Sequence, residues 1–268
     1  MKIAVILGRI EQKDKCAAEQ LMAYLRFRGE DATLYEPFTC KNEDDAPYKS
    51  DLIFVLGGDG AIIHAAERAA AYGTPILGVN YGHLGYLAEM DRLDLLLIDK
   101  VLSGEYTVEE RMMLKVSLEG ESGYALNDLV VSRNGMAGVV EVEVFCNGRS
   151  VGNYRCDGMI VATPTGSTAY SLSAGGSVVD PSLSCFCLTP VCAHSFTARP
   201  LIFSPDSLLR IRNTDRLSRS MLCALDGCRE RTLEAGQALT IEKSPYGARF
   251  VRLTDRGFYD TLREKMMN

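Results

Sequence analysis

The chain has 268 residues, a length that suits one large domain or two of ordinary size. Apolar residues make up 47% of it and the formal net charge is -6, so we expect a substantial core and neither nucleic acid nor an anionic membrane as partner. No apolar run reaches the ~18 residues of a membrane span, and the first, Ile3 to Leu7, is too short for a secretory signal. These features predict a cytoplasmic protein.

The nine cysteines are odd in number and form no Cys-x-x-Cys pair. They indicate neither a disulfide framework nor a zinc site. Reduced thiols that serve as small core residues of a cytosolic protein are the favoured interpretation.

Residues 2–103 alternate between short apolar runs and segments with helical apolar spacing. Ala17, Leu21 and Leu25 recur every four residues and predict a helix that Gly29 ends. The predicted strands are 3–7, 31–35, 51–56 and 75–80, and the predicted helices are 13–28, 61–72 and 93–102. This alternation predicts a Rossmann-like α/β domain with a parallel sheet.

After about residue 105, short β-rich runs between turn residues replace the helices. Asn147-Gly148 lies between the runs 142–146 and 150–155 and predicts a β-hairpin. The other predicted strands are 113–119, 125–132, 139–145, 159–163, 201–203, 208–212, 221–225 and 238–243. We therefore predict an α/β domain of residues 1–104, completed by a C-terminal helix within 255–268, and a mostly antiparallel β domain of residues 105–254.

A glycine turn that holds one carboxylate, Gly57-Gly58-Asp59-Gly60, joins the strand 51–56 to the helix 61–72. Glycines let the backbone approach a ligand, and a helix N-terminus offers free N–H groups that suit a phosphate. An aspartate would repel that phosphate, but it can take a proton from a hydroxyl or help to hold a metal that bridges phosphates. The turn therefore predicts phosphoryl transfer, with an ordinary Gly-Asp-Gly turn as the alternative.

The three histidines are weaker candidates. His64 lies one helical turn beyond the glycines, where it either faces a phosphate or occupies the helix surface. His83 and His194 have no partner visible in the sequence, so core or capping roles are the simpler interpretation. The sequence has no Gly-x-x-x-x-Gly-Lys-Ser/Thr motif, which excludes a P-loop kinase, and it supports no Ser-His-Asp triad.

A second group of polar residues follows the predicted strand 159–163. The segment from Pro164 to Gly176 consists mostly of small and hydroxyl-bearing residues. Ser167, Thr168 and Tyr170 can bond to ribose hydroxyls, base edges or phosphate, and Tyr170 can stack on a base. A hydroxyl-rich surface loop is the alternative, but the density of hydroxyls favours a binding function.

Asn127-Asp128 is a polar pair inside the apolar run 125–132. Asn and Asp are poor strand residues, so two of them together need a purpose. An amide beside a carboxylate suits the paired hydroxyls of a ribose, and a bulge or an edge position is the alternative.

In this order and spacing, these motifs resemble the NAD kinase family. The resemblance rests on residues 57–60, Asn127-Asp128 and the segment 157–176, and it extends to residues 188–190 and 198–201, so it covers nearly the whole chain. The glycine turn is shared with phosphofructokinases and diacylglycerol kinases, whereas the segment 157–176 is highly specific. The implied fold is that of NAD kinase and phosphofructokinase.

The resemblance implies transfer of the γ-phosphoryl group of ATP to the 2′-hydroxyl of the adenosine ribose of NAD, which gives NADP. Asp59 would be the general base and Gly57, Gly58 and Gly60 would approach the phosphates. Mg²⁺ or another divalent metal would accompany ATP, without an assigned protein ligand. Homodimers or homotetramers are implied, and polyphosphate stays open as a donor. The residues implied to bind NAD are Asp59, Gly60, His64, Asn127, Asp128, Arg155, Asp157, Thr168, Ala169, Tyr170, Ser171, Leu172 and Ser173.

Three positions depart from the family pattern. Ala61 replaces a Thr or Asn, Asp128 replaces the more usual Glu, and Cys228 stands where some relatives carry Gln. Two alternative functions fit fewer of these residues. A lipid or sugar kinase would share only the glycine turn, and a nucleotide sensor without catalysis would bind an anion more easily with a neutral residue in place of Asp59.

Overall fold

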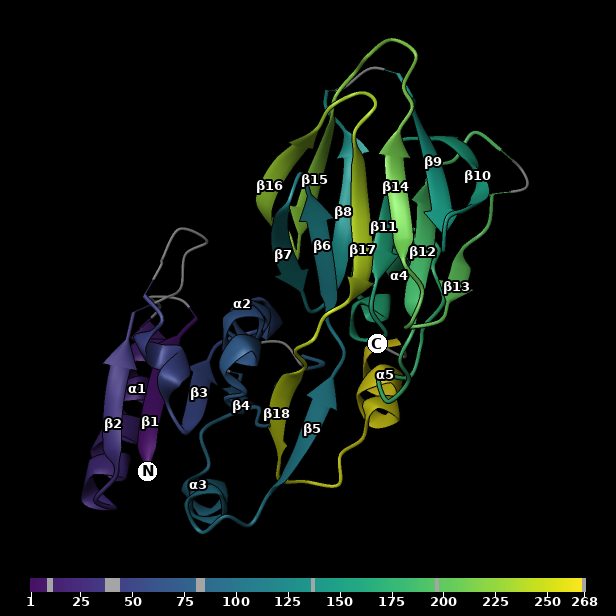
Figure 1. The fold of residues 1–268 in the computed structure, drawn as a ribbon. Coiled ribbons are helices and arrows are strands. Elements are labelled where there is room, and N and C mark those ends of the chain that lie inside the picture. The colour runs from purple at the N-terminus through teal and green to yellow at the C-terminus, as the bar shows by residue number, and fades with distance from the viewer. Residues whose placement is uncertain (9–11, 37–43, 81–84, 136–137, 196–197, 267–268) are drawn as a thin grey trace. The chain divides into compact units, whose positions relative to one another are not determined.

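The structure is a computed structural model that describes residues 1–8, 12–36, 44–80, 85–135, 138–195 and 198–266. The chain forms two compact units. The first consists of residues 1–111 and 246–268, and the second of residues 112–245 (Figure 1). The first is an α/β unit and the second an antiparallel β unit, as the sequence predicts.

The first unit is built on a six-stranded sheet of order β2-β1-β3-β4-β18-β5. The first five strands in that order are mutually parallel, and β5 pairs antiparallel with β18. The strands are β1 (Lys2–Leu7), β2 (Asp31–Tyr35), β3 (Leu52–Leu56), β4 (Ile76–Val79), β5 (Thr107–Arg111) and β18 (Ala248–Arg252). Every residue of β3 is buried, which explains its continuous apolar run.

Helices complete the first unit. They are α1 (Gln12–Phe27), α2 (Asp59–Ala69), α3 (Leu95–Leu102) and α5 (Phe258–Met266), with short 3-10 turns η1 (Ala46–Lys49) and η2 (Ala70–Tyr72). Leu21 and Leu25 of α1 are fully buried in one core with Val5 of β1 and Phe54 of β3. The apolar stripe that predicts α1 is thus the face that it packs on the sheet.

Two strands of this sheet, β5 and β18, are absent from the sequence prediction, and the expected boundaries at 104 and 254 exclude both. Only Arg111 of the edge strand β5 is buried, so its apolar signal is weak. Its register with β18 joins Val108 to Val251, and no local pattern reveals a pairing across that separation.

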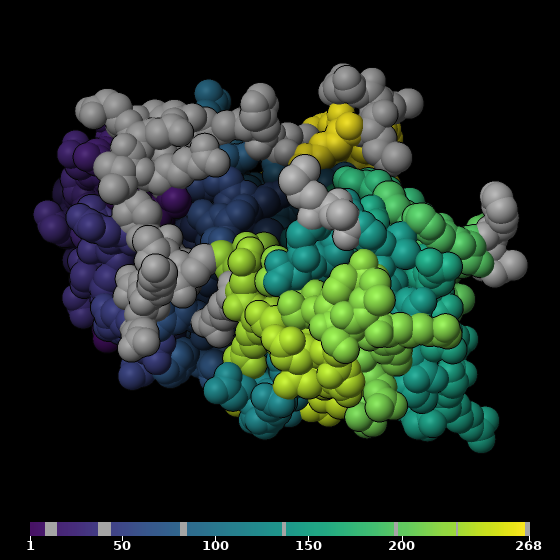
Figure 2. Space-filling model, turned by 90° about the horizontal axis from the view of Figure 1, so that it is seen from above, coloured from purple at the N-terminus to yellow at the C-terminus, as the bar shows by residue number. Residues whose placement is uncertain are grey.

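The second unit consists of two antiparallel six-stranded sheets, of orders β10-β9-β14-β17-β6-β7 and β13-β12-β11-β8-β15-β16. A single apolar core draws on both sheets, including Val142 of β9 and Ile211 of β14 from one, and Met159 of β11 and Phe186 of β12 from the other. Figure 2 shows this unit end-on, with the teal and the yellow-green segments side by side, as the order β9-β14-β17-β6 requires.

The elements of the second unit are β6 (Leu114–Leu118), β7 (Glu121–Ala125), β8 (Asp128–Arg133), β9 (Val140–Cys146), β10 (Arg149–Cys156), β11 (Gly158–Ala162), β12 (Phe186–Val191), β13 (Leu201–Phe203), β14 (Leu209–Asn213), β15 (Met221–Leu225), β16 (Cys228–Leu233), β17 (Ala238–Lys243), η3 (Thr165–Thr168) and α4 (Tyr170–Ser173). The predicted hairpin is confirmed, with Asn147 at φ 51° and Gly148 at φ 77° between β9 and β10. The strand predicted over 125–132 is confirmed for residues 128–132, which lie in β8, and is wrong at its start, because β7 ends at Ala125 and a turn precedes Asp128.

The expectation of reduced thiols in the core is confirmed for part of the described cysteines. Cys156, Cys185, Cys187 and Cys223 are buried thiols, and Cys16 and Cys192 are exposed thiols. Cys228 is disulfide-bonded, so the expectation of reduced thiols throughout is wrong there. Among the described helices, none has both the length and the apolar character that crossing a membrane requires.

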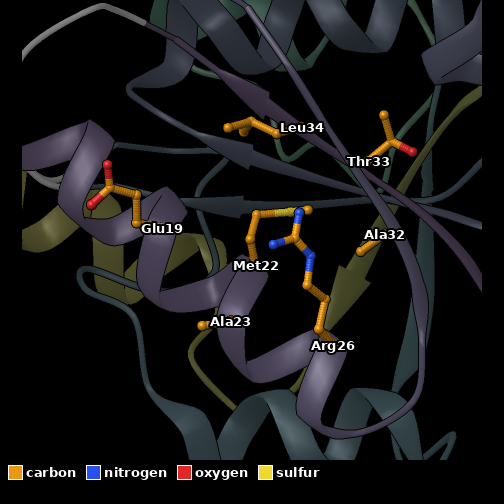
Figure 3. Close-up of a pocket in the computed structure, with 7 residues that line it drawn as sticks. All are labelled: Glu19, Met22, Ala23, Arg26, Ala32, Thr33 and Leu34. Atoms are coloured by element: carbon orange, nitrogen blue, oxygen red, sulfur yellow. The ribbon is translucent and has the colours of Figure 1, made fainter.

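A surface trough of about 510 Å³ lies over α1 and β2 (Figure 3). Met22 and Arg26 come from the helix, and Thr33 and Leu34 from the strand. None of the residues predicted to bind a substrate lines it, so it is a feature apart from the predicted site.

Candidate active site

The glycine turn lies where the sequence predicts it, between β3 and α2. The N–H of Gly57 donates to the carbonyl of Val79 over 2.9 Å, which ties the turn to the end of β4. A Cβ on Gly57 would lie 2.9 Å from the Cα of Gly8, so close packing demands this glycine. At Gly58 and Gly60 a Cβ would meet no atom within 4 Å. These two exposed glycines therefore border open space at the N-terminus of α2, where a phosphate can approach.

Asp59 is the first residue of α2, and backbone groups fix its half-buried side chain. Its two carboxylate oxygens accept from the N–H of Tyr86 over 2.7 Å and of Leu87 over 3.2 Å. Each oxygen keeps a lone pair for a further donor such as a substrate hydroxyl. The Asp59 carboxylate also raises the pKa of Tyr86, adding to the larger effect of that phenol's burial.

Gly85 leaves the space that the Asp59 carboxylate occupies. A Cβ on Gly85 would lie 2.0 Å from Oδ1 of Asp59, a distance that no two non-bonded heavy atoms tolerate. We expect Gly85→Ala to displace the carboxylate and to lower kcat at least about 10-fold, because misplaced catalytic groups lose this much or more. The unaltered chain is the reference, measured beside the variant in a steady-state assay. Equal kcat values for the two proteins would contradict the expectation.

The structure describes two of the three histidines, His64 and His194. His64 is half-buried on α2, five residues beyond Asp59. His194 is exposed, so a core role is wrong for it, although its N–H donates to the carbonyl of Arg155 over 2.7 Å. His83 lies outside the residues that the structure describes.

In the second unit, Asn127 and Asp128 occupy a tight turn from β7 into β8. Its carbonyls are held by Thr163, whose hydroxyl donates to the Leu126 carbonyl over 2.5 Å and whose N–H donates to the Asn127 carbonyl over 2.8 Å. A Cβ on Gly166 would lie 2.1 Å from the Asn127 carbonyl oxygen, so the hydroxyl-rich segment packs directly on this turn. The structure thus brings together two motifs that lie far apart in the sequence.

Asp226 holds the other side of the same turn, and sequence reasoning gave it no role. Its carboxylate accepts from the N–H groups of Leu126, Asn127 and Asp128, over 2.7, 2.8 and 3.0 Å. Burial of the carboxyl raises the pKa of Asp226 to about 6, against the lowering effect of the three donors. Asp226-Gly227 is the tip of the β15–β16 hairpin, with φ angles of 49° and 71°. An Asp-Gly pair between apolar runs signals such a hairpin, but not the contact of its side chain.

Asp128 is 5% exposed and carries a strongly perturbed carboxyl group. Burial, reinforced by the Asp226 carboxylate, raises the pKa of Asp128 to about 7. A carboxyl whose pKa is higher in the folded than in the unfolded chain adds stability that is complete below the unfolded pKa of about 4. That stability is lost as the pH rises through about 7.

The free energy of unfolding is therefore expected to depend on pH through Asp128. The free energy of unfolding of the unaltered chain should fall by about 2–3 kcal/mol between pH 5 and pH 8, relative to that of Asp128→Asn. Urea unfolding of both proteins at the two pH values measures this difference. If the free energies of unfolding of the two proteins differ by the same amount at pH 5 and at pH 8, Asp128 does not titrate in this range.

The hydroxyl-rich segment contains both internal and outward-facing groups. Ser171 is fully buried and its hydroxyl pairs with that of Thr189 over 2.9 Å, while Ser167 bonds to the carbonyl of Pro164 over 2.6 Å. These hydroxyls hold the segment together, which corrects the expectation that Ser167 and Ser171 face a ligand. Tyr170 is 48% exposed and Ser173 is exposed, so their side chains remain accessible.

Tyr170 and Asp157 line the same cavity, which has a volume of about 360 Å³. Arg133, Val191 and Cys192 are also among its lining residues. Arg133 lies 3.7 Å from Asp157, between its Nε and Oδ1. Arg155 points elsewhere, toward Glu141 at 3.5 Å, and does not line the cavity. The cavity combines an aromatic face, a carboxylate and a guanidinium, as a site for a polar aromatic ligand requires.

Comparison with known protein families shows which family the chain belongs to. The model of the ATP-NAD kinase N-terminal domain matches residues 12–106, and that of the ATP-NAD kinase C-terminal domain matches residues 126–253. The chain belongs to the NAD kinase family. A curated NAD kinase of Symbiobacterium thermophilum is 39% identical over 279 residues, which cover 99% of this chain and 98% of that one. The NAD kinase of Carboxydothermus hydrogenoformans is 42% identical over 229 residues, covering 83% and 81%.

Solved structures of NAD kinases share the fold. An NAD kinase from Archaeoglobus fulgidus, crystallised in complex with ATP, has a TM-score of 0.82 at 25% identity, covering 100% of this chain and 99% of that one. Yeast NADH kinase, crystallised with NADH, has a TM-score of 0.89 at 23% identity, covering 100% and 88%. The two-unit architecture is therefore that of NAD kinases.

The family resemblance implies a divalent metal with ATP, and the residues can be tested for ligands. In the described ranges no three His, Cys, Asp or Glu side chains gather where they could hold a metal ion. Mg²⁺ is commonly bound by substrate phosphates with only one or two carboxylates.

Proposed function

We propose that this chain transfers the γ-phosphoryl group of ATP to the 2′-hydroxyl of the adenosine ribose of NAD, with Asp59 as general base. Membership in the NAD kinase family supports the general activity, which is phosphorylation of NAD with ATP. The position of transfer and the role of Asp59 are our own proposals. In the reaction the 2′-hydroxyl gives its proton to Asp59, its oxygen bonds to the γ-phosphorus, and the bond to the β-phosphate oxygen breaks to release ADP.

The observation that carries this proposal is the fixed carboxylate of Asp59 at a helix N-terminus. Two backbone N–H groups orient it, and exposed Gly58 and Gly60 flank it. A negative side chain in this place is unfavourable for holding a phosphate, whereas it is suited to accepting a proton beside one. The N–H groups of the first turn of α2 would bind phosphate, and Mg²⁺ bound to ATP would neutralise the charge that develops on its oxygens.

The second unit supplies the residues that we propose to recognise the dinucleotide. Asn127 and Asp128 offer an amide and a carboxylate for ribose hydroxyls, on a turn held by Thr163 and Asp226. Tyr170 offers a face for stacking, and its cavity includes Asp157. From the predicted set, Thr168, Ala169, Leu172 and Ser173 remain proposed contacts, together with Gly60, His64 and Arg155.

A panel of donors and acceptors tests this function. Purified protein is incubated with Mg-ATP or polyphosphate as donor, and with NAD, NADH, fructose 6-phosphate or a diacylglycerol as acceptor. We expect phosphorylation of NAD and none of the sugar or the lipid. A sugar or lipid product, or tight NAD binding without any turnover, would support one of the two alternative functions instead. We also propose a homo-oligomer, which light scattering of the purified protein tests, and a cytoplasmic location, which fractionation of cells tests.

A further inference from the structure

The loop of residues 85–91 connects Asp59 to the C-terminal part of the first unit. We propose that the C-terminal segment 252–265 positions Asp59 by holding this loop, with Arg252 and Glu89 as positioning residues. The proposal rests on the proposed role of Asp59. It adds two charged side chains that none of the sequence motifs includes.

One end of the connection lies at Asp59. The N–H groups of Tyr86 and Leu87 hold its carboxylate, and Gly85 leaves room for it. Among the described residues, these two N–H groups are the donors that the structure gives this carboxylate. The direction in which its free lone pairs point is therefore set by the backbone of the loop.

The other end of the connection is a network of charges around Arg252, the last residue of β18. Its Nη1 donates to the carbonyl of Leu87 over 3.3 Å, so Leu87 bonds to Asp59 through its N–H and to Arg252 through its carbonyl. The Nε of Arg252 donates to Glu109 over 2.7 Å, and its Nη1 lies 3.3 Å from Glu89. One guanidinium thereby fixes the loop against two strands of the sheet.

Glu89 joins the same loop to the chain beyond β18. Its side chain is only 4% exposed, and one carboxylate oxygen accepts from the N–H groups of Leu253 and Thr254, both over 2.8 Å, and from the Thr254 hydroxyl over 2.9 Å. The backbone of Glu89 is itself fixed, because its N–H donates to the carbonyl of Gly78 over 3.0 Å. The loop is therefore held at both Leu87 and Glu89.

Helix α5 adds contacts to the same loop. The ring of Phe258 lies 6.1 Å from that of Tyr86, and the ammonium of Lys265 lies 4.0 Å over the Tyr86 ring. Arg256 donates to Asp91 over 3.2 Å at the far end of the loop. Tyr86 also donates its N–H to Asp59, so α5 packs on a residue that holds the base.

A partly buried ion network is an uneconomical way to attach a strand, because apolar side chains of similar volume often give equal or greater stability than buried ion pairs. Charged groups give something that apolar packing does not, which is a defined direction for each hydrogen bond. A catalytic carboxylate needs that precision, since positions must hold within about 0.5 Å of the productive geometry. We therefore assign the network to orientation of the loop and, through it, of Asp59.

The test compares Arg252→Ala, Arg252→Lys and Glu89→Gln with Arg249→Ala. Arg249 is the matched control, because it is an exposed arginine of the same strand that donates to a different backbone carbonyl, that of Gly73, over 2.7 Å. We expect Arg252→Ala and Glu89→Gln to lower kcat about 10-fold with KM values for NAD and ATP changed less than about 2-fold. Arg252→Lys should recover part of the loss, and Arg249→Ala should match the unaltered chain.

A double-mutant cycle separates positioning from mere stability. In an Asp59→Asn background, measured with an NADP-cycling assay, Arg252→Ala should cause no further fall in kcat, because the group that it positions is gone. An equal fall in both backgrounds, or a lower melting temperature with an unchanged kcat, would overturn the proposal. If Arg252→Ala does not fold, Arg252→Lys and Glu89→Gln carry the same cycle. Absence of NADP formation by the unaltered chain would refute the proposed function instead.

Discussion

Asp59→Asn is expected to lower the turnover of NAD by ~10²-fold or more, the scale of a lost general base. The amide has nearly the same shape as the carboxylate, so the turn and the start of α2 should keep their structure. The NH₂ group of the asparagine cannot accept a proton. It would also face one of the two backbone N–H groups, that of Tyr86 or of Leu87, that now donate to the carboxylate. Steady-state kinetics give the loss in kcat, and calorimetric titration with NAD gives the affinity.

Retained NAD binding with lost turnover is the result that defines a base. We expect the dissociation constant for NAD to change less than about 5-fold while kcat collapses. Asp51→Asn is a suitable control, because Asp51 is an exposed aspartate of the same unit whose Oδ2 also accepts a backbone N–H, that of Lys2, over 2.7 Å. A kcat in Asp59→Asn near that of the control would remove Asp59 from the chemistry.

Asp226→Ala is expected to lower the free energy of unfolding by about 3 kcal/mol and to weaken NAD binding at least 10-fold. The substitution leaves the N–H groups of Leu126, Asn127 and Asp128 without their acceptor. The turn that carries the proposed ribose contacts would then lose the bonds that fix one of its sides. Urea unfolding and calorimetric titration with NAD measure the two effects.

Asp215→Ala provides the comparison for this second prediction. Asp215 is also a carboxylate of the second unit that holds a turn, accepting from the N–H of Leu217 over 3.0 Å and of Arg219 over 3.2 Å. Its loss should destabilise the fold without changing NAD affinity. Equal effects of the two substitutions on NAD affinity would mean that Asp226 acts only on overall stability. If Asp226→Ala does not fold, Asp226→Asn replaces it in the same comparison.

The sequence predicts most of the fold because most elements carry their own pattern. The buried run of β3 and the four-residue spacing of α1 are local signals, and both elements lie within a residue or two of their predicted limits. Asn147-Gly148 likewise contains all that its hairpin requires, since both residues adopt positive φ. The run 125–132 misleads at its start, because the polar pair Asn127-Asp128 belongs to a turn that distant residues, Thr163 and Asp226, hold in place.

The parts of the site that the sequence could not reveal depend on contacts between distant residues. Asp226 contacts residues 98–100 positions away, and Arg252 contacts Leu87 from 165 positions away. Nothing at Asp226 itself distinguishes it from any Asp-Gly hairpin. Ser167 and Ser171 show the converse, because a hydroxyl-rich run does not tell which hydroxyls point inward.

A crystal structure with NAD bound would give the most direct measurement, the distance from the Asp59 carboxylate to the oxygens of the adenosine ribose. We predict that one carboxylate oxygen either lies about 2.6–3.2 Å from the 2′-oxygen or is linked to it by a single water molecule. A ribose bound with another hydroxyl nearest to Asp59, or an NAD molecule bound out of its reach, would contradict the proposed mechanism.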